Sequence, residues 1–232
     1  MARDIFRDRT EAGRVLAQKL SAYSHRPDVI VLSLPRGGVP VAYEVARALG
    51  APLDVFLVRK LGVPGYEELA MGAIASGGIR LLNREVIDAL GIGPKAIEAV
   101  AQREARELHR REQLYRQGWP PLDVRGRTAI LVDDGLATGY SMRAAVQSLR
   151  QLGPARIVVA VPTAPRETCA ELQDLADEVI CAITPRPFGG VGAWYQDFSQ
   201  TSDDEVRELL RRAADTPQEP TPAGPAPSDH TH

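Results

Sequence analysis

The fold is decided by the stretch Ala129-Ile130-Leu131-Val132-Asp133-Asp134-Gly135-Leu136-Ala137-Thr138-Gly139-Tyr140-Ser141-Met142. Its first four residues are apolar, which is typical of a strand that is buried on both faces of a sheet. Two adjacent acids follow, and a turn of small residues then leads into a helix predicted at about 141–152. The unit places carboxylates beside free backbone N–H groups, hydroxyl donors and the positive end of a helix dipole. Because carboxylates accept hydrogen bonds from sugar hydroxyls while a helix start takes a phosphate, the stretch favours a phosphorylated sugar as ligand.

The same alternation of strand and helix continues on both sides of this stretch. Apolar runs predict further strands at 29–32, 53–58, 157–161 and 179–183, and helical spacing predicts helices at 9–23, 40–49, 165–175 and about 202–212. In between we expect a loop at 60–70, a hairpin or strand pair at 71–82 and a helical region at 84–117. The later part of this region is interpreted as a solvated helix that lies on the domain or on a partner, with a thin apolar stripe through Ile97, Ala101, Leu108 and Tyr115, rather than as a nucleic-acid contact. The alternation predicts the α/β class, with a doubly wound, mostly parallel sheet flanked by helices.

The composition excludes several classes of protein. The 232 residues are 44% hydrophobic and 25% charged with a formal net charge of −2, which is ordinary for a globular protein and lacks the basic excess that favours nucleic-acid binding. The first ten residues hold no apolar signal region, and no apolar run is long enough to span a bilayer, so the cytoplasm is the expected compartment.

We interpret Cys169 and Cys181 as small core residues rather than as a disulfide or metal pair. Residues 213–232 are rich in Pro, Thr and Ala and are expected to be disordered.

The deciding stretch closely resembles the signature with which type I phosphoribosyltransferases bind 5-phosphoribosyl-1-pyrophosphate (PRPP), and the chain looks closest to bacterial proteins described only as predicted phosphoribosyltransferases. The resemblance implies that Asp133 and Asp134, as solvent-facing side chains, contact the ribose hydroxyls. It also implies that the 5-phosphate is wrapped by Ala137, Thr138, Gly139, Tyr140 and Ser141. The alternative is a solvated acidic turn followed by a helix cap at Ser141.

Two other loops after strands match the same family in chain order. The turn Arg36-Gly37-Gly38 resembles its pyrophosphate loop, because paired glycines let a backbone approach an anion and Arg36 offers a charge-assisted contact. The family often holds a non-proline cis peptide there, so we expect unusual geometry at Arg36–Gly37. Arg59 and Lys60 fall where the family has a mobile catalytic loop, and these two cations are expected to stabilise the departing pyrophosphate. A plain turn and a surface basic pair are the respective alternatives.

A segment near the C-terminus is rich in aromatic residues. The family has a variable hood over the acceptor, so Phe188, Trp194 and Tyr195 are expected to stack on a base. A satellite hydrophobic cluster that pins the last helix is the alternative. We therefore expect one domain over 1–212, with a core at about 28–183, a helical insertion at about 84–117 and a hood at about 184–200.

The resemblance implies a Mg²⁺-dependent transferase that moves the 5-phosphoribosyl group of PRPP to a small nitrogen acceptor. Asp133 and Asp134 are the candidate metal ligands, with Asp133 first. No nucleic-acid or membrane partner is expected, and a homodimer is left open. The rival is a PRPP-sensing regulatory or binding protein with little transferase activity. A dinucleotide-binding oxidoreductase is disfavoured, because no Gly-x-Gly-x-x-Gly follows the first predicted strand.

Overall fold

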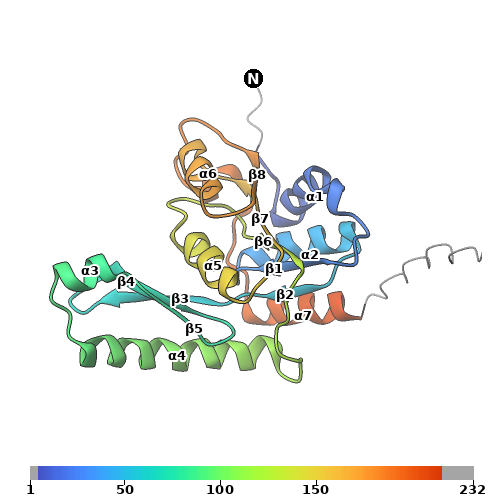
Figure 1. Ribbon diagram of the computed structural model, residues 1–232. Coiled ribbons are helices and arrows are strands. Elements are labelled where there is room, and N and C mark those ends of the chain that lie inside the picture. The colour runs from blue at the N-terminus through green and yellow to red at the C-terminus, as the bar shows by residue number, and fades with distance from the viewer. Residues whose placement is uncertain (1–4, 216–232) are drawn as a thin grey trace, which may run out of the picture.

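A five-stranded parallel sheet forms the centre of the computed structural model, which describes residues 5–215 (Figure 1). The strand order is β2-β1-β6-β7-β8, and every neighbouring pair is parallel. The strands are β1 Val29–Ser33, β2 Leu53–Val55, β6 Thr128–Val132, β7 Arg156–Thr163 and β8 Glu178–Ile183. The helices around them are α1 Arg9–Lys19, η1 Ser21–Tyr23, α2 Gly38–Leu49, α5 Tyr140–Gln151, α6 Arg166–Gln173 and α7 Asp203–Ala214. The expected doubly wound α/β class is confirmed.

Alternate residues of the central strands supply two separate cores. Val31 and Val132 face the side covered by α1, α2 and α7, whereas Leu32 and Leu131 face the side covered by α5 and α6. All four side chains are completely buried, and each such burial stabilises the fold by about 1.5–3 kcal/mol. Burial on both faces explains why these strands are continuous apolar runs in the sequence.

The part of the chain that follows β2 and precedes β6 forms an antiparallel arm that projects from the body, with α4 running along it (Figure 1). It consists of β3 Val58–Val63, β4 Tyr66–Ala75, β5 Ile79–Leu82, α3 Arg84–Ala89 and α4 Pro94–Arg116. The expected hairpin at 71–82 is present, but the loop expected at 60–70 is wrong because most of it belongs to β3 and β4. The first residues of β4 are exposed on both faces, so no alternation of apolar and polar residues marks this part as a strand. The predicted strand at 53–58 correspondingly ends at Val55.

The helix α4 is anchored to both the arm and the sheet. The apolar stripe predicted along it is buried, together with Val100. At its end, Arg116 donates to both carboxylate oxygens of buried Asp54 on β2, at 2.8 and 3.0 Å. The burial of Asp54 raises its pKa, and the Arg116 guanidinium opposes that rise. The helix therefore lies on the domain through its apolar stripe, which is the first of the two arrangements expected from the sequence.

The segment after β8 is tied to the N-terminal segment. It contains the short helix η2 Val191–Trp194. The Phe6 N–H donates to the Trp194 carbonyl at 2.9 Å, and the Gln196 N–H donates to the Phe6 carbonyl at 2.8 Å. The Phe6 ring lies beside the Tyr195 ring, with centroids 5.6 Å apart.

The interpretation of the two cysteines as unbonded core residues is wrong, because Cys169 and Cys181 form a disulfide. Cys169 belongs to α6 and Cys181 to β8, and α6 packs against β8. Taken separately, each segment indicated only a buried position, whereas the disulfide depends on how the helix crosses the strand. Among residues 5–215, no helix combines the length and apolar character needed to cross a membrane. Disorder was predicted for residues 213–232. The first of these residues belong to α7, which continues through Ala214, and residues 216–232 lie outside the described part of the chain.

Candidate functional site

The paired acids and the paired glycines meet at one edge of the sheet. Strands β1 and β6 are parallel neighbours, so the segments that follow them leave the sheet side by side. A Cβ atom on Gly37 would lie 2.1 Å from Asp134 Oδ2, and one on Gly38 would lie 2.9 Å from Asp133 Cα. Both positions therefore require glycine for the turn to approach the acids this closely. The peptide between Pro35 and Arg36 is cis, one bond before the Arg36–Gly37 peptide at which unusual geometry was expected.

Asp134 is held by the N-terminal helix rather than facing solvent. Its Oδ2 accepts from Arg9 Nε at 2.8 Å, and the two side chains are only 15% and 11% exposed. The Arg9 guanidinium also lies 4.0 Å from the centroid of the Phe198 ring. The Asp134 carbonyl accepts from the Tyr195 hydroxyl at 2.5 Å. The expectation that both acids face solvent is thus wrong for Asp134, because α1 and the segment after β8 close over it.

Asp133 has a different environment from its neighbour. Its Oδ1 accepts from the Asp134 N–H at 2.9 Å, and its side chain lines the cavity described below. Burial raises the pKa of Asp133 well above the ordinary value, and the nearby Asp134 charge adds to the rise. Burial also raises the pKa of Asp134, although Arg9 opposes that rise. A cation or a hydroxyl donor beside Asp133 would therefore relieve an unfavourable buried negative charge.

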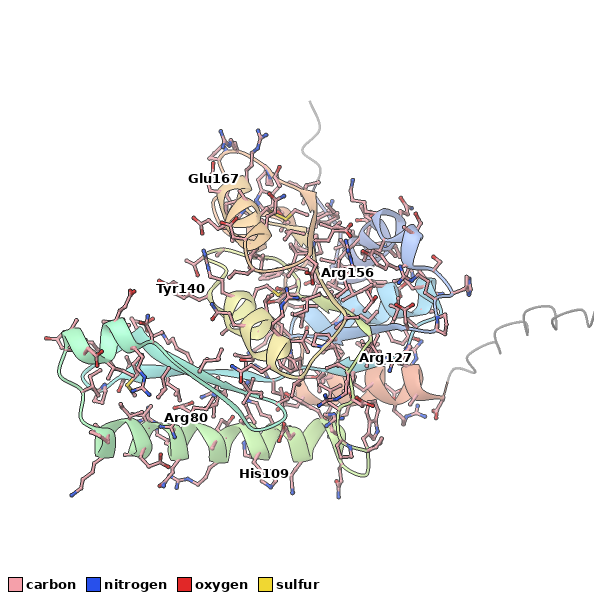
Figure 2. All side chains as sticks on the ribbon, viewed as in Figure 1. Arg80, His109, Arg127, Tyr140, Arg156 and Glu167 are labelled. Atoms are coloured by element: carbon pink, nitrogen blue, oxygen red, sulfur yellow. A yellow bond between two sulfur atoms is a disulfide. The ribbon has the colours of Figure 1, made fainter. Side chains whose placement is uncertain are left out.

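The segment 137–141 presents backbone donors at the start of α5. Within residues 5–215, no side chain caps the first turn of this helix, so its N–H groups remain available to an anion. Gly139 has φ +73°, and a Cβ atom there would lie 2.8 Å from Thr168 Cγ2. The Thr168 hydroxyl donates to the Ala137 carbonyl at 2.9 Å, so α6 supports the loop from behind. Tyr140 extends outward from this point and is 66% exposed (Figure 2).

A cavity of about 100 Å³ joins the strand ends to the arm and α4. The chemistry-bearing residues in its wall are Asp133, Ser141, Arg59 and Arg111. The rest of the wall is apolar and consists of Leu34, Pro35, Phe56, Leu57, Val58 and Leu108. The structure therefore brings together a carboxylate, the start of α5, the turn after β1 and two arginines.

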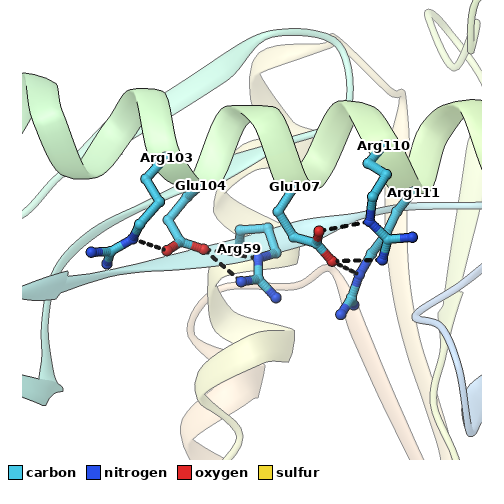
Figure 3. Close-up of polar contacts among 6 residues, drawn as sticks. All are labelled: Arg59, Arg103, Glu104, Glu107, Arg110 and Arg111. Atoms are coloured by element: carbon cyan, nitrogen blue, oxygen red, sulfur yellow. Dashed lines mark hydrogen bonds and ion pairs between the residues drawn. The ribbon is translucent and has the colours of Figure 1, made fainter.

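The two cations predicted at 59 and 60 point in different directions. Arg59 lines the cavity and donates to Glu104 Oε2 through Nε and an Nη atom, at 3.0 and 2.6 Å (Figure 3). Lys60 follows it on β3 and lies 3.4 Å from a carboxylate oxygen of Glu68. Because successive side chains of a strand face opposite sides, Lys60 does not reach the cavity wall. Arg36 is also outside the wall, with one guanidinium nitrogen 3.9 Å from Asp203 of α7.

The three predicted hood residues do not present open faces to the cavity. Trp194 and Tyr195 are 8% and 6% exposed, and the Trp194 indole N–H donates to the carbonyl of half-buried Phe188 at 2.7 Å. Tyr195 packs with Phe6 in a small separate cluster. The alternative of a satellite cluster therefore describes this segment better, except that the cluster fixes the N-terminal segment and α1 rather than the last helix.

Sequence reasoning missed two residues of this region, Arg9 and Arg111. Arg9 precedes the first sheet strand and pairs with an acid 125 residues away, so no local pattern marks it. Arg111 belongs to a helix rich in arginine and glutamate, where it does not differ from its neighbours. A helical projection relative to Leu108 would have placed Arg111 on the buried side of α4, because residues three apart share a helix face.

The described residues contain no group of three or more His, Cys, Asp or Glu side chains that could hold a metal ion. Among the described residues, Asp133 is the one carboxylate in the wall of the cavity. Mg²⁺ commonly binds through one or two carboxylates together with substrate oxygens, and Asp133 fits that mode.

Comparison with known proteins gives consistent results. Residues 6–196 match the family model described as "Phosphoribosyl transferase domain". The chain is 49% identical over 209 residues to the Mycobacterium tuberculosis protein "Putative phosphoribosyl transferase Rv0571c", covering 90% of this chain and 47% of that protein. It is 33% identical over 129 residues to the "Bifunctional protein PyrR" of Chloroflexus aurantiacus, covering 54% of this chain and 65% of that protein. The chain thus spans about half to two thirds of these curated relatives.

The structure is similar to the crystal structure of the protein TT1426 from Thermus thermophilus. The two have a TM-score of 0.81 and 43% sequence identity, over 90% of this chain and 98% of that one.

Proposed function

Since this chain belongs to the phosphoribosyltransferase family, we propose that it binds PRPP and transfers the 5-phosphoribosyl group to a nitrogen acceptor with release of pyrophosphate. The observation that carries the proposal is the meeting of Asp133, Ser141 and the turn after β1 around one cavity. In the reaction, the acceptor nitrogen forms a bond to C1 as the bond from C1 to pyrophosphate breaks. The leaving oxygen takes the electron pair, and the nitrogen then loses a proton.

The start of α5 is the proposed 5-phosphate site. The N–H groups of Ala137, Thr138, Gly139, Tyr140 and Ser141, with the hydroxyls of this segment, would bind the phosphate. The helix dipole would add to this attraction. The exposure of Ala137 and Thr138 supports the assignment, because a ligand can approach the loop from solvent.

The proposed ribose site is the acid pair. Asp133 would accept hydrogen bonds from a ribose hydroxyl, since it lines the cavity. Asp134 is proposed as the second ribose contact, although its Oδ2 already accepts a hydrogen bond from Arg9. Mg²⁺, when bound with PRPP, would neutralise negative charge on the pyrophosphate, with Asp133 as its first protein ligand and Asp134 as the second candidate.

The leaving group would be stabilised by the turn after β1 and by the arm. Gly37 and Gly38 let backbone approach the pyrophosphate, and Arg59 faces the cavity. Arg36 and Lys60, the other predicted cations, would need to leave Asp203 and Glu68 before contacting the ligand. We therefore place Arg59 first among the cations.

The acceptor is proposed to be a nucleobase other than a 6-oxopurine. Family members that act on 6-oxopurines typically carry an aspartate at the position of Ala137, where it exchanges a proton with the purine ring. Ala137 has no group that can do so. Phe188 remains a candidate acceptor contact, whereas the burial of Trp194 and Tyr195 leaves less room for their predicted stacking role.

A PRPP-binding protein without turnover is the second candidate. It is favoured by the burial of Trp194 and Tyr195, because the predicted acceptor site then offers fewer aromatic faces on which a base could stack. The experiment is pyrophosphate release from PRPP and Mg²⁺ with a panel of nucleobases, alongside calorimetric titration with PRPP. Release with one base supports the transferase, and tight binding with silence across the panel supports the binding protein. Absence of PRPP binding would refute both.

A further inference from the structure

Two arginines from different elements line the same cavity. Arg59 comes from β3 and Arg111 from the C-terminal half of α4, and Asp133 lies in the same wall. The two side chains are 30% and 32% exposed, so both are partly shielded but open to a ligand. Two guanidinium groups at one small cavity form a recognition site for a strongly anionic group, because each presents a rigid fork of donors.

Each of these arginines is held by a glutamate of α4 (Figure 3). Glu104, whose side chain is 11% exposed, accepts from Arg59 and also from Arg103 at 3.0 Å. Glu107 accepts from Arg111 at 2.8 Å and from Arg110 at 2.8 and 2.9 Å. Hydrogen bonds from Arg110 and Arg111 lower the pKa of Glu107 to about 2, so its carboxylate is charged at neutral pH. The glutamates thus fix two cations in an orientation that is set before any ligand arrives.

A third arginine approaches this region from the turn after β1. A guanidinium nitrogen of Arg36 lies 3.9 Å from Asp203 Oδ1, the same oxygen that accepts from the Tyr115 hydroxyl of α4. Arg111 lies about one helical turn before Tyr115 on α4, so Arg36 and Arg111 approach the same region, where α4 meets α7. This convergence places α4 on the pyrophosphate side of the cavity, since Arg36 belongs to the turn assigned to that group.

We propose that Arg111 binds the pyrophosphate group of PRPP together with Arg59, and that Glu104 and Glu107 are positioning residues for the two arginines. The inference rests on the proposed function and adds α4, which lies outside the strand-end loops, to the ligand site. The 5-phosphate has separate donors at the start of α5. Arg111 is therefore expected to contribute to the binding of ligands that carry pyrophosphate and not to the binding of ribose 5-phosphate.

The test is calorimetric titration of the full chain with PRPP, inorganic pyrophosphate and ribose 5-phosphate, each with Mg²⁺. Arg111→Ala is expected to weaken PRPP and pyrophosphate binding about 10-fold to 100-fold, the usual effect of losing a charge-assisted contact. Ribose 5-phosphate binding should change less than about twofold. Arg111→Lys should recover part of the loss, because it restores the charge but not the fork.

Arg110→Ala is the matched control. Arg110 shares Glu107 with Arg111 but is 59% exposed and is absent from the cavity wall. Its loss should change PRPP affinity less than about threefold, since exposed charges act weakly. Glu107→Gln should weaken pyrophosphate binding in the wild-type background and have almost no further effect in Arg111→Ala, as expected for a residue that acts through Arg111.

The outcomes separate the two proposals. If the wild type binds PRPP but Arg111→Ala behaves as Arg110→Ala does, the assignment of Arg111 is overturned and the proposed function stands. The assignment is also overturned if all three ligands weaken equally. If the wild type binds none of the ligands, the proposed function fails and the inference fails with it. Melting temperatures of the variants within about 3 °C of wild type would show that weaker ligand binding does not result from loss of the fold.

Discussion

Substitution of Gly37 by alanine tests whether the turn after β1 and the acid pair are built as one unit. The added Cβ would lie 2.1 Å from Asp134 Oδ2, and real Cβ atoms do not approach other atoms within 3.0 Å. The two groups would have to separate by about 0.9 Å. The carboxylate cannot move freely, because Arg9 binds the same oxygen and the side chain is 15% exposed. Overpacking of this kind costs about 1–3 kcal/mol.

We expect Gly37→Ala to lower the free energy of unfolding by that amount in urea denaturation and to weaken PRPP binding at least about tenfold. The backbone of Gly37 is right-handed helical, with φ −59°, so alanine brings no conformational penalty and the effect isolates the contact. Gly93→Ala is the control. Gly93 has φ −70°, and apart from its two chain neighbours no described residue has an atom within 4 Å of the point that its Cβ would occupy, so this replacement should change stability by less than about 0.5 kcal/mol.

A double-mutant cycle identifies the partner in this contact. In an Asp134→Ala background the oxygen that the new Cβ would strike is absent, so the cost of Gly37→Ala should fall by about 1 kcal/mol or more. An equal cost in both backgrounds would refute the proposed contact. Full stability and full PRPP affinity in Gly37→Ala would show that this turn does not require glycine.

Three further predictions concern Asp133, the acceptor and the disulfide. The pKa of Asp133 is raised in the fold, so its protonated form favours folding and this contribution is lost as pH rises through the raised pKa. Asp133→Asn should therefore lose PRPP binding but match or exceed the wild-type melting temperature at pH 8. A lower melting temperature at pH 8 would contradict the idea that the charged Asp133 is unfavourably buried. Hypoxanthine, guanine and xanthine should release little pyrophosphate in a steady-state assay, and robust turnover of any of them without gain in Ala137→Asp would contradict the inference from Ala137. Reduction of the disulfide between Cys169 and Cys181, which are 12 residues apart, should lower the free energy of unfolding by about 3 kcal/mol, because the unfolded chain gains conformational entropy. Urea denaturation curves that are the same with and without dithiothreitol would count against this contribution.

The central sheet could be predicted from sequence because its signals are local. Buried parallel strands are continuous apolar runs, and helix boundaries carry their own marks, such as Ser202, which accepts from the Glu205 N–H at 3.1 Å as the capping pattern predicts. The meeting of the glycine turn with the acid pair could also be anticipated, because both follow strands of one parallel sheet.

The remaining features depend on contacts between distant segments. The direction of Lys60 follows from strand alternation, which could not be applied while residues 60–70 were predicted to be a loop. The arginine pairs of Asp134 and Glu104 join elements 125 and 45 residues apart. No periodicity in the sequence records such separations, so they emerge only when the elements are packed.

A crystal structure of the protein with PRPP and Mg²⁺ would show directly whether the ends of β1 and β6 and the start of α5 form the ligand site. We expect the 5-phosphate to lie against the backbone N–H groups of 137–141 and a ribose hydroxyl to donate a hydrogen bond to Asp133. The pyrophosphate is expected to lie between the turn 35–38 and Arg59. PRPP bound with its 5-phosphate away from the start of α5, or with no contact to Asp133, would contradict this assignment of the ligand site.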